Sequence, residues 1–264
     1  MDLAPEIRGL RIRGARIRKP DILLDGEPVE RFCDRLRGAA IRDVDRRGKY
    51  LLLLLDRDRV LQVQLRMTGR FALGRGAPDI ADFDHVAAEF DLDDGRTLFY
   101  DDVRRLGGFR LLPAEAWEEA ASRMGPEPLG PEFTASRFRR ILDASRAPVK
   151  NLLLDQRRVA GIGNIYGSEA LHLAGIDPRR PARSLEPDEA DALRGAIRDV
   201  LRRALERAGT TFRDYRAVDG RPGRFQESLR VYGREGLACP RCGGGVRRIV
   251  QAGRSTFFCP DCQR

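Results

Sequence analysis

Four cysteines near the end of the chain have the spacing of a metal site. They occur as two Cys-x-x-Cys pairs, CPRC and CPDC, separated by sixteen residues. Such pairs are typical of two knuckles that hold one zinc ion through four thiolates. A disulfide framework is the alternative, but the N-terminus has no secretion-signal pattern, so we expect a reducing compartment. The sequence therefore predicts one structural Zn²⁺ with the ligands Cys239, Cys242, Cys259 and Cys262.

The segment between the cysteine pairs, RRIVQAGRSTFF, has the pattern of a β-hairpin with Ala252 and Gly253 at its turn. This arrangement presents Arg254 close to the hairpin tip. An arginine on a metal-stiffened hairpin is suited to contact a phosphate or a groove of nucleic acid. An arginine that is simply solvated is the alternative.

Amines that could react are scarce. Only Lys19, Lys49 and Lys150 are lysines among 49 basic residues. A lysine amine can lose its proton and attack or transfer a proton, whereas a guanidinium cannot. The net charge of +9 and the pI near 9.8 favour a polyanionic partner such as nucleic acid, with a generally basic surface as the alternative. No apolar run has membrane-spanning length, so we expect a soluble cytoplasmic protein.

The elements that position these residues fall into three regions. Alternating and apolar runs predict antiparallel strands from about residue 41 to 112, and the Pro/Gly-rich stretch GPEPLGP then marks a linker. A helical region follows, in which Ser184 is expected to cap the longest helix and Gly209 to end it. We expect an α+β multidomain protein: an antiparallel β-sandwich over 1–124, a helical domain over 125–235 and a zinc finger over 236–264.

Gly161, Gly163 and Asn164 lie between two helical patterns in the stretch LLLDQRRVAGIGNIYGSEALHLAGIDP. Glycines there let the backbone pass close to a ligand, and the following helix start offers free N–H groups to a phosphate. This stretch resembles the helix-two-turns-helix of the formamidopyrimidine-DNA glycosylase and endonuclease VIII family.

Further motifs resemble that family in order along the chain. RRGKYLLL is similar to its lysine-bearing hairpin, LRMTGRF and DDVRRLGGF to its two intercalation loops, GTTFRDYRAVDGRPGRF to its lesion-capping loop, and the cysteine tail to its zinc finger. The resemblance covers about residues 2–264, and the capping loop favours the formamidopyrimidine branch. It implies base-excision repair: a DNA glycosylase with AP-lyase activity that removes oxidised purines such as formamidopyrimidine and 8-oxoguanine.

The resemblance also assigns roles in DNA binding. A nucleotide must leave the duplex before its C1′ can be reached, and a wedge must fill the gap. The family's wedge corresponds to Met67, Arg104 and Leu106, although core packing is the alternative for Met67. The partner implied is double-stranded DNA containing oxidised bases or abasic sites, bound by a monomer. The remaining candidate DNA contacts are Lys150, Asn164 and His85, although for His85 a buried or structural role is the favoured expectation.

For catalysis, the resemblance makes Lys49 the proton donor in β-elimination and gives Arg254 the δ-elimination role. The family's nucleophile is a proline amine in a Pro-Glu segment that follows the initiator methionine. That segment is not found here, and Pro5 is an internal imide without a free amine.

The first residues of the chain also bear on the Pro-Glu segment. Leu3, Ile7 and Leu10 have the spacing of one helix face and match the later part of the family's first helix. We expect either a start codon assigned too late, which the other motifs favour, or a truncated product. A catalytically inactive damaged-DNA-binding protein is the alternative function. An unrelated zinc-ribbon nucleic-acid binder is disfavoured by the RRGKY hairpin.

Overall fold

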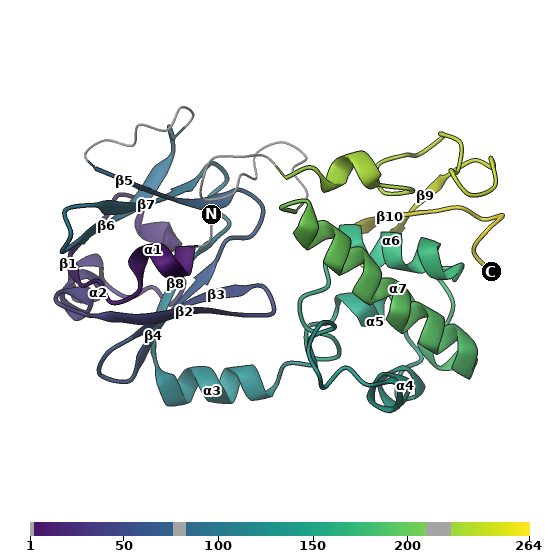
Figure 1. Ribbon diagram of the computed structural model, residues 1–264, viewed down its shortest axis with the longest axis horizontal. Helices are drawn as coiled ribbons and strands as arrows, with labels where there is room; N and C mark the ends of the chain where they lie inside the picture. Colours follow the sequence, from purple (N-terminus) through teal and green to yellow (C-terminus); the bar gives the residue numbers. More distant parts are fainter. Residues whose placement is uncertain (1–2, 76–82, 210–222) are drawn as a thin grey trace. The chain divides into compact units, whose positions relative to one another are not determined.

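The computed structural model describes residues 3–75, 83–209 and 223–264 (Figure 1). Its contacts divide the described chain into two compact units. The first contains residues up to 122, and the second contains 123–209 and 224–264, so the C-terminal hairpin belongs to the same unit as the helices. Within these ranges, no helix combines the length and apolar character needed to cross a bilayer.

The first unit is built on two four-stranded antiparallel sheets, as the sequence predicts. One sheet has the order β1-β6-β7-β5 and the other the order β2-β3-β4-β8. The strand at 12–17 lies outside the predicted strand region, because its apolar pattern is broken by two arginines and by Gly14, where the pairing has a bulge. The strands are β1 (Ile12–Ile17), β2 (Ile41–Arg47), β3 (Tyr50–Leu55), β4 (Arg59–Gln64), β5 (Gly69–Gly74), β6 (Val86–Leu92), β7 (Thr97–Asp102) and β8 (Gly108–Pro113).

Phe109 lies at the centre of this unit's core, 1% exposed. Its ring centroid is 4.7 Å from that of Tyr100 and 5.5 Å from that of Phe90, in edge-on arrangements that aromatic rings favour. The short helices α1 (Leu3–Ile7) and α2 (Val29–Leu36) add buried side chains to the same core. Leu3 and Ile7 are buried, which confirms the predicted apolar face. Another helix, α3 (Ala114–Ser122), follows β8.

The second unit contains the helical domain. The long helix α7 has an apolar face that includes Leu193 and Ile197, both fully buried or nearly so. The prediction that Ser184 caps α7 is wrong: the helix begins with Pro187, and Glu186 forms a capping box with Glu189. Gly209, at φ 87°, donates its N–H to Ala204 O and ends the helix as predicted. The helices are α4 (Ala135–Asp143), α5 (Val149–Leu154), α6 (Asn164–Ala174) and α7 (Pro187–Glu206).

A buried carboxylate joins α6 to the segment that leads into the zinc finger. Glu169 is 3% exposed, and its two oxygens accept the backbone N–H groups of Arg230, Val231 and Tyr232 at 2.9–3.0 Å. Three consecutive N–H groups in a non-helical segment need acceptors, and the two carboxylate oxygens of Glu169 accept all three hydrogen bonds. It therefore fixes where the chain enters its last module.

We predict that Glu169→Gln destabilises the protein by about 1–3 kcal/mol, because an amide places a donor against backbone donors and removes the charge that strengthens these bonds. Urea unfolding followed by circular dichroism measures the loss. Glu206→Gln is the matched control, because Glu206 is exposed in α7 and its change should stay within about 0.5 kcal/mol. Equal effects of the two substitutions would contradict the role of Glu169.

Candidate nucleic-acid interface and metal centre

The four cysteine sulfurs of the C-terminal module lie together. All four Sγ atoms are within 4.8 Å of one another, with Cys239 and Cys262 at 3.7 Å and Cys242 and Cys259 at 3.5 Å. Tetrahedral coordination with Zn–S bonds of about 2.3 Å places sulfurs about 3.8 Å apart, so this set fits one zinc ion. The spacing in the sequence predicted these ligands, and the fold brings all four together.

Backbone N–H groups contact two of the four sulfurs. The N–H groups of Arg241 and Gly244 point at Cys239 and Cys242, each at 3.4 Å from sulfur. Although burial opposes it, hydrogen bonds from backbone N–H groups lower the pKa of Cys239 to about 7. The Nε2 atom of buried His172 lies 3.3 Å from the Cys239 sulfur, a contact that the sequence analysis did not anticipate. A thiolate surrounded by donors is the form that binds zinc.

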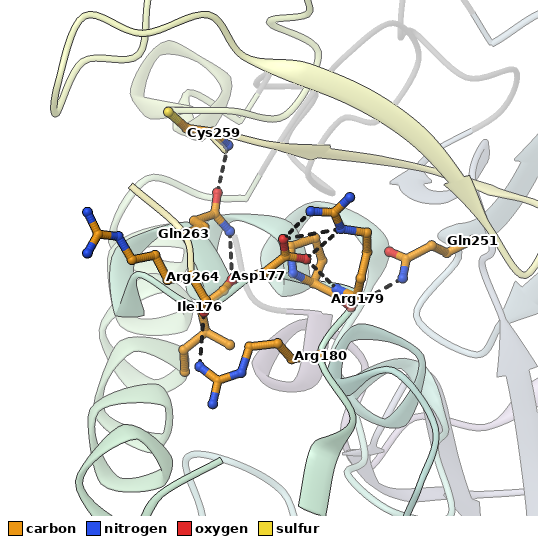
Figure 2. A network of polar contacts seen from close by, with 9 residues as sticks. Ile176, Asp177, Arg179, Arg180, Gln251, Cys259, Gln263 and Arg264 are labelled. Carbon is orange, nitrogen blue, oxygen red and sulfur yellow. Dashed lines mark hydrogen bonds and ion pairs between the residues drawn. The ribbon is translucent and has the colours of Figure 1, made fainter. Parts of the chain in front are cut away.

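A network of polar side chains ties the second cysteine pair to the helices (Figure 2). The amide of Gln263, 2% exposed, accepts the N–H of Cys259 at 2.8 Å and donates to Ile176 O at 2.8 Å. From strand β9, Gln251 donates to Pro178 O at 3.2 Å. The metal module is therefore bonded to the turn that follows α6.

The hairpin has the predicted form. Strands β9 (Arg247–Gln251) and β10 (Arg254–Phe258) pair through a turn at Ala252 and Gly253, whose φ angles of 46° and 72° suit a two-residue hairpin. Arg254 is the exposed first residue of β10. The sequence therefore placed this arginine correctly at the tip.

Lys150 and Asn164 hold the strand that carries Arg254. The ammonium of Lys150 donates to Thr256 Oγ1 at 2.6 Å and to Ser255 O at 3.1 Å, while Asn164 Nδ2 donates to the same Ser255 O at 2.9 Å. Lys150 is fully buried, and burial, followed by the charge of Arg254, lowers its pKa to about 8. A direct contact of Lys150 with DNA stays a prediction; what the structure shows is its bond to the hairpin.

In the first unit, Lys49 lies on an exposed turn. Gly48 and Lys49 connect β2 to β3, with Gly48 at φ 59° and Arg47 paired with Tyr50. Arg46 donates to Gly48 O at 2.8 Å and so braces the turn. Because the hairpin turn is short and rigid, the backbone of Lys49 has little freedom when a partner binds.

Met67, Arg104 and Leu106 are exposed on two neighbouring loops. Met67 is 63% and Leu106 48% exposed, which rules out the core-packing alternative for Met67. Arg104 Nη1 lies 3.2 Å from Met67 Sδ, so the structure brings these two predicted residues together. Large apolar side chains this exposed indicate an interaction surface.

His85 is exposed just before β6, so the expectation of a buried structural histidine is wrong. Its backbone is fixed by the N–H bond to Asp101 Oδ1 at 2.7 Å. The segment predicted as the lesion-capping loop, 209–225, lies mostly outside the described residues. Sequence reasoning also missed Asp102 and Thr68, which are buried beside the two exposed loops and whose residue types alone gave no signal.

Family models match three stretches of the chain. Residues 1–109 match the formamidopyrimidine-DNA glycosylase N-terminal domain, residues 124–216 its H2TH domain, and residues 236–264 a zinc finger found in FPG and IleRS.

Relatives and solved structures match nearly the whole chain. A formamidopyrimidine-DNA glycosylase from Heliobacterium modesticaldum is 47% identical, covering 99% of this chain and 95% of the relative. The Lactococcus lactis Fpg in complex with DNA containing an abasic site is 34% identical, with a TM-score of 0.89 and coverage of 99% and 95%. The Thermus thermophilus MutM (FPG) protein is 44% identical, with a TM-score of 0.85 and coverage of 98% and 93%. On this identity and coverage, the chain belongs to the formamidopyrimidine-DNA glycosylase family.

Proposed function

We propose that this protein is a base-excision-repair DNA glycosylase with AP-lyase activity, acting on oxidised purines in duplex DNA. Solved relatives support it, because Lactococcus lactis Fpg forms complexes with DNA containing Fapy-dG and with DNA containing an abasic site. We further propose that the protein acts as a monomer on chromosomal DNA in a bacterial cytoplasm.

The exposed group formed by Met67, Arg104 and Leu106 carries this proposal. Two large apolar side chains in water are costly unless a partner covers them, and the arginine between them can hydrogen-bond a base. A nucleotide rotated out of the duplex leaves a gap of the kind that such a group fills. The group therefore acts as a wedge that keeps the damaged nucleotide outside the stack.

Charged groups in both units supply the remaining roles. Lys49 donates a proton during β-elimination, and Arg254 serves δ-elimination from the hairpin tip. Asn164 in the second unit and His85 in the first contact phosphates, and Lys150 supports strand β10, which carries Arg254. Zinc supplies a crosslink between the two cysteine pairs, which keeps the hairpin folded where a core of this size would be insufficient.

Binding of lesion-bearing DNA tests the proposal directly. We expect wild-type protein to bind a duplex with a tetrahydrofuran abasic analogue more tightly than the intact duplex, measured by fluorescence anisotropy. Met67→Ala should reduce this preference about tenfold, the cost of losing one buried apolar side chain. Leu129→Ala is the control, because Leu129 is also exposed but lies outside the wedge. Equal binding of both duplexes by the wild type would refute the proposal.

Lys49→Ala should slow strand cleavage at an abasic site by about 10²–10⁴-fold, the usual contribution of a positioned proton donor. Zinc content should not change, because Lys49 lies outside the metal module. Single-turnover cleavage of labelled DNA measures the rate, with Lys19→Ala as the control. Unchanged cleavage in Lys49→Ala would remove this residue from the mechanism.

Removal of zinc with a strong chelator should weaken DNA binding at all sequences, because the hairpin loses its crosslink. The slope of log affinity against log salt should fall by about 0.9 for each phosphate that the unfolded hairpin no longer neutralises. Readdition of Zn²⁺ should restore both the affinity and the slope. A fully demetallated protein that binds with the original affinity and slope would contradict a structural role for zinc.

Borohydride trapping on abasic-site DNA separates the enzyme from a protein that only binds damage. A covalent adduct requires a reactive amine in the polypeptide, since the trapped species is a reduced Schiff base. We expect an adduct of one polypeptide per strand, visible as a mobility shift in a denaturing gel. Tight lesion binding without an adduct would favour the binding protein.

A further inference from the structure

A buried carboxylate lies beneath the wedge. Asp102, the last residue of β7, is 1% exposed. One of its oxygens accepts the hydroxyl of Thr68, and the other accepts the N–H of Gly107 at 2.9 Å and the hydroxyl of Tyr100 at 3.2 Å. Thr68 follows Met67, and Gly107 follows Leu106, so the carboxylate bonds to both loops that carry the wedge.

The same contacts continue through Thr68. Its hydroxyl donates to Asp102 and accepts the backbone N–H of Arg104 at 3.2 Å. The 102–107 loop is therefore held on each side of Arg104 and Leu106, while the neighbouring loop is held immediately after Met67. The Thr68 hydroxyl thus links the Met67 loop to the 102–107 loop through two bonds, one to Asp102 and one from Arg104.

Close packing around Tyr100 leaves no room for a side chain at two glycines next to these loops. A Cβ atom added at Gly69 would lie 2.6 Å from the Tyr100 hydroxyl, and one at Gly107 would lie 2.2 Å from it. Arg66 and Arg105, in the same loops, adopt φ angles of 53° and 49°, which non-glycine residues keep only where surrounding contacts hold them. The lack of a side chain at Gly69 and Gly107 thus makes room for the hydrogen bonds among Tyr100, Asp102 and Thr68. These bonds in turn hold the loop backbones in place.

Tyr100 remains a hydrogen-bond donor in this cluster. Burial first, and the charge of Asp102 second, raise the pKa of the Tyr100 hydroxyl above its ordinary value. All the donors around Asp102 thus stay protonated over the working pH range. A buried carboxylate with three donors is well satisfied, and removal of its charge would leave the donors with a weaker acceptor.

We propose that Asp102 is a positioning residue that locks the Met67 loop to the Arg104–Leu106 loop, so that the wedge enters DNA as one preorganised unit. This inference rests on the proposed function of the wedge. Preorganisation increases affinity because the loops lose little freedom when DNA binds. Asp102 itself is 1% exposed, so it acts through the two loops to which it is bonded.

The test compares Asp102→Asn with Glu89→Gln. Glu89 is a suitable control, because it is a buried carboxylate in the same sheet, 4% exposed, whose partners are Arg16 and Arg18 rather than the loops. Affinities for intact and tetrahydrofuran-containing duplexes are measured by anisotropy, and folding is checked by thermal melting. We expect Asp102→Asn to lose about tenfold in lesion preference and Glu89→Gln to keep it. Thr68→Val carries the same expectation as Asp102→Asn with a smaller structural change.

A double-mutant cycle separates positioning from general destabilisation. In a Met67→Ala, Leu106→Ala background, Asp102→Asn should have little further effect on lesion preference, because both apolar side chains of the wedge are already gone and only Arg104 remains to be positioned. An undiminished effect there, or a folded Asp102→Asn with wild-type preference, would overturn the inference. A wild-type protein without lesion preference would instead contradict the proposed function.

Discussion

A polar group that is removed from water needs hydrogen-bonding partners, and this constraint positions the irregular segments of the protein. Asp102 meets it with donors from two loops, Glu169 with three consecutive backbone N–H groups, and Lys150 with acceptors on strand β10. Asp102 and Glu169 come from regular elements and bond to loop segments, whereas Lys150 comes from α5 and bonds to one strand of the C-terminal hairpin. These bonds hold the wedge loops, the segment at residues 230–232 and the C-terminal hairpin against the regular elements.

The two units obtain that rigidity in different ways. The sandwich has a large apolar core around Phe109, which holds its strands without other help. The C-terminal module has only a small buried group, so the cysteine cluster and the bonds to the helices replace a core. Because Lys150 and Asn164 bond to β10, the hairpin is fixed from the helical side as well as by its cysteines.

Local sequence rules predicted much of the site. The spacing of Cys239, Cys242, Cys259 and Cys262 identified the ligands, because a tetrahedral thiolate site needs two short knuckles. Gly253 marked the hairpin turn, because glycine readily adopts the positive φ that the turn requires, and Ala252 beside it adopts one as well. Ser184 was misplaced as a helix cap, because Glu186 and Pro187 a few residues later give a stronger start. Met67 could not be separated from a core residue until its exposure was known.

The sequence by itself determined the metal ligands, the antiparallel strands, the long helix and, through its ordered motifs, the family. Those features depend on residue type and on spacings of a few residues. Only the tertiary structure decided that Asp102 reaches Thr68, 34 residues earlier, and that Lys150 reaches Thr256, 106 residues later. Burial and pairing across such separations depend on how the sheets and helices pack. No local sequence pattern indicates which distant residues the packing brings together.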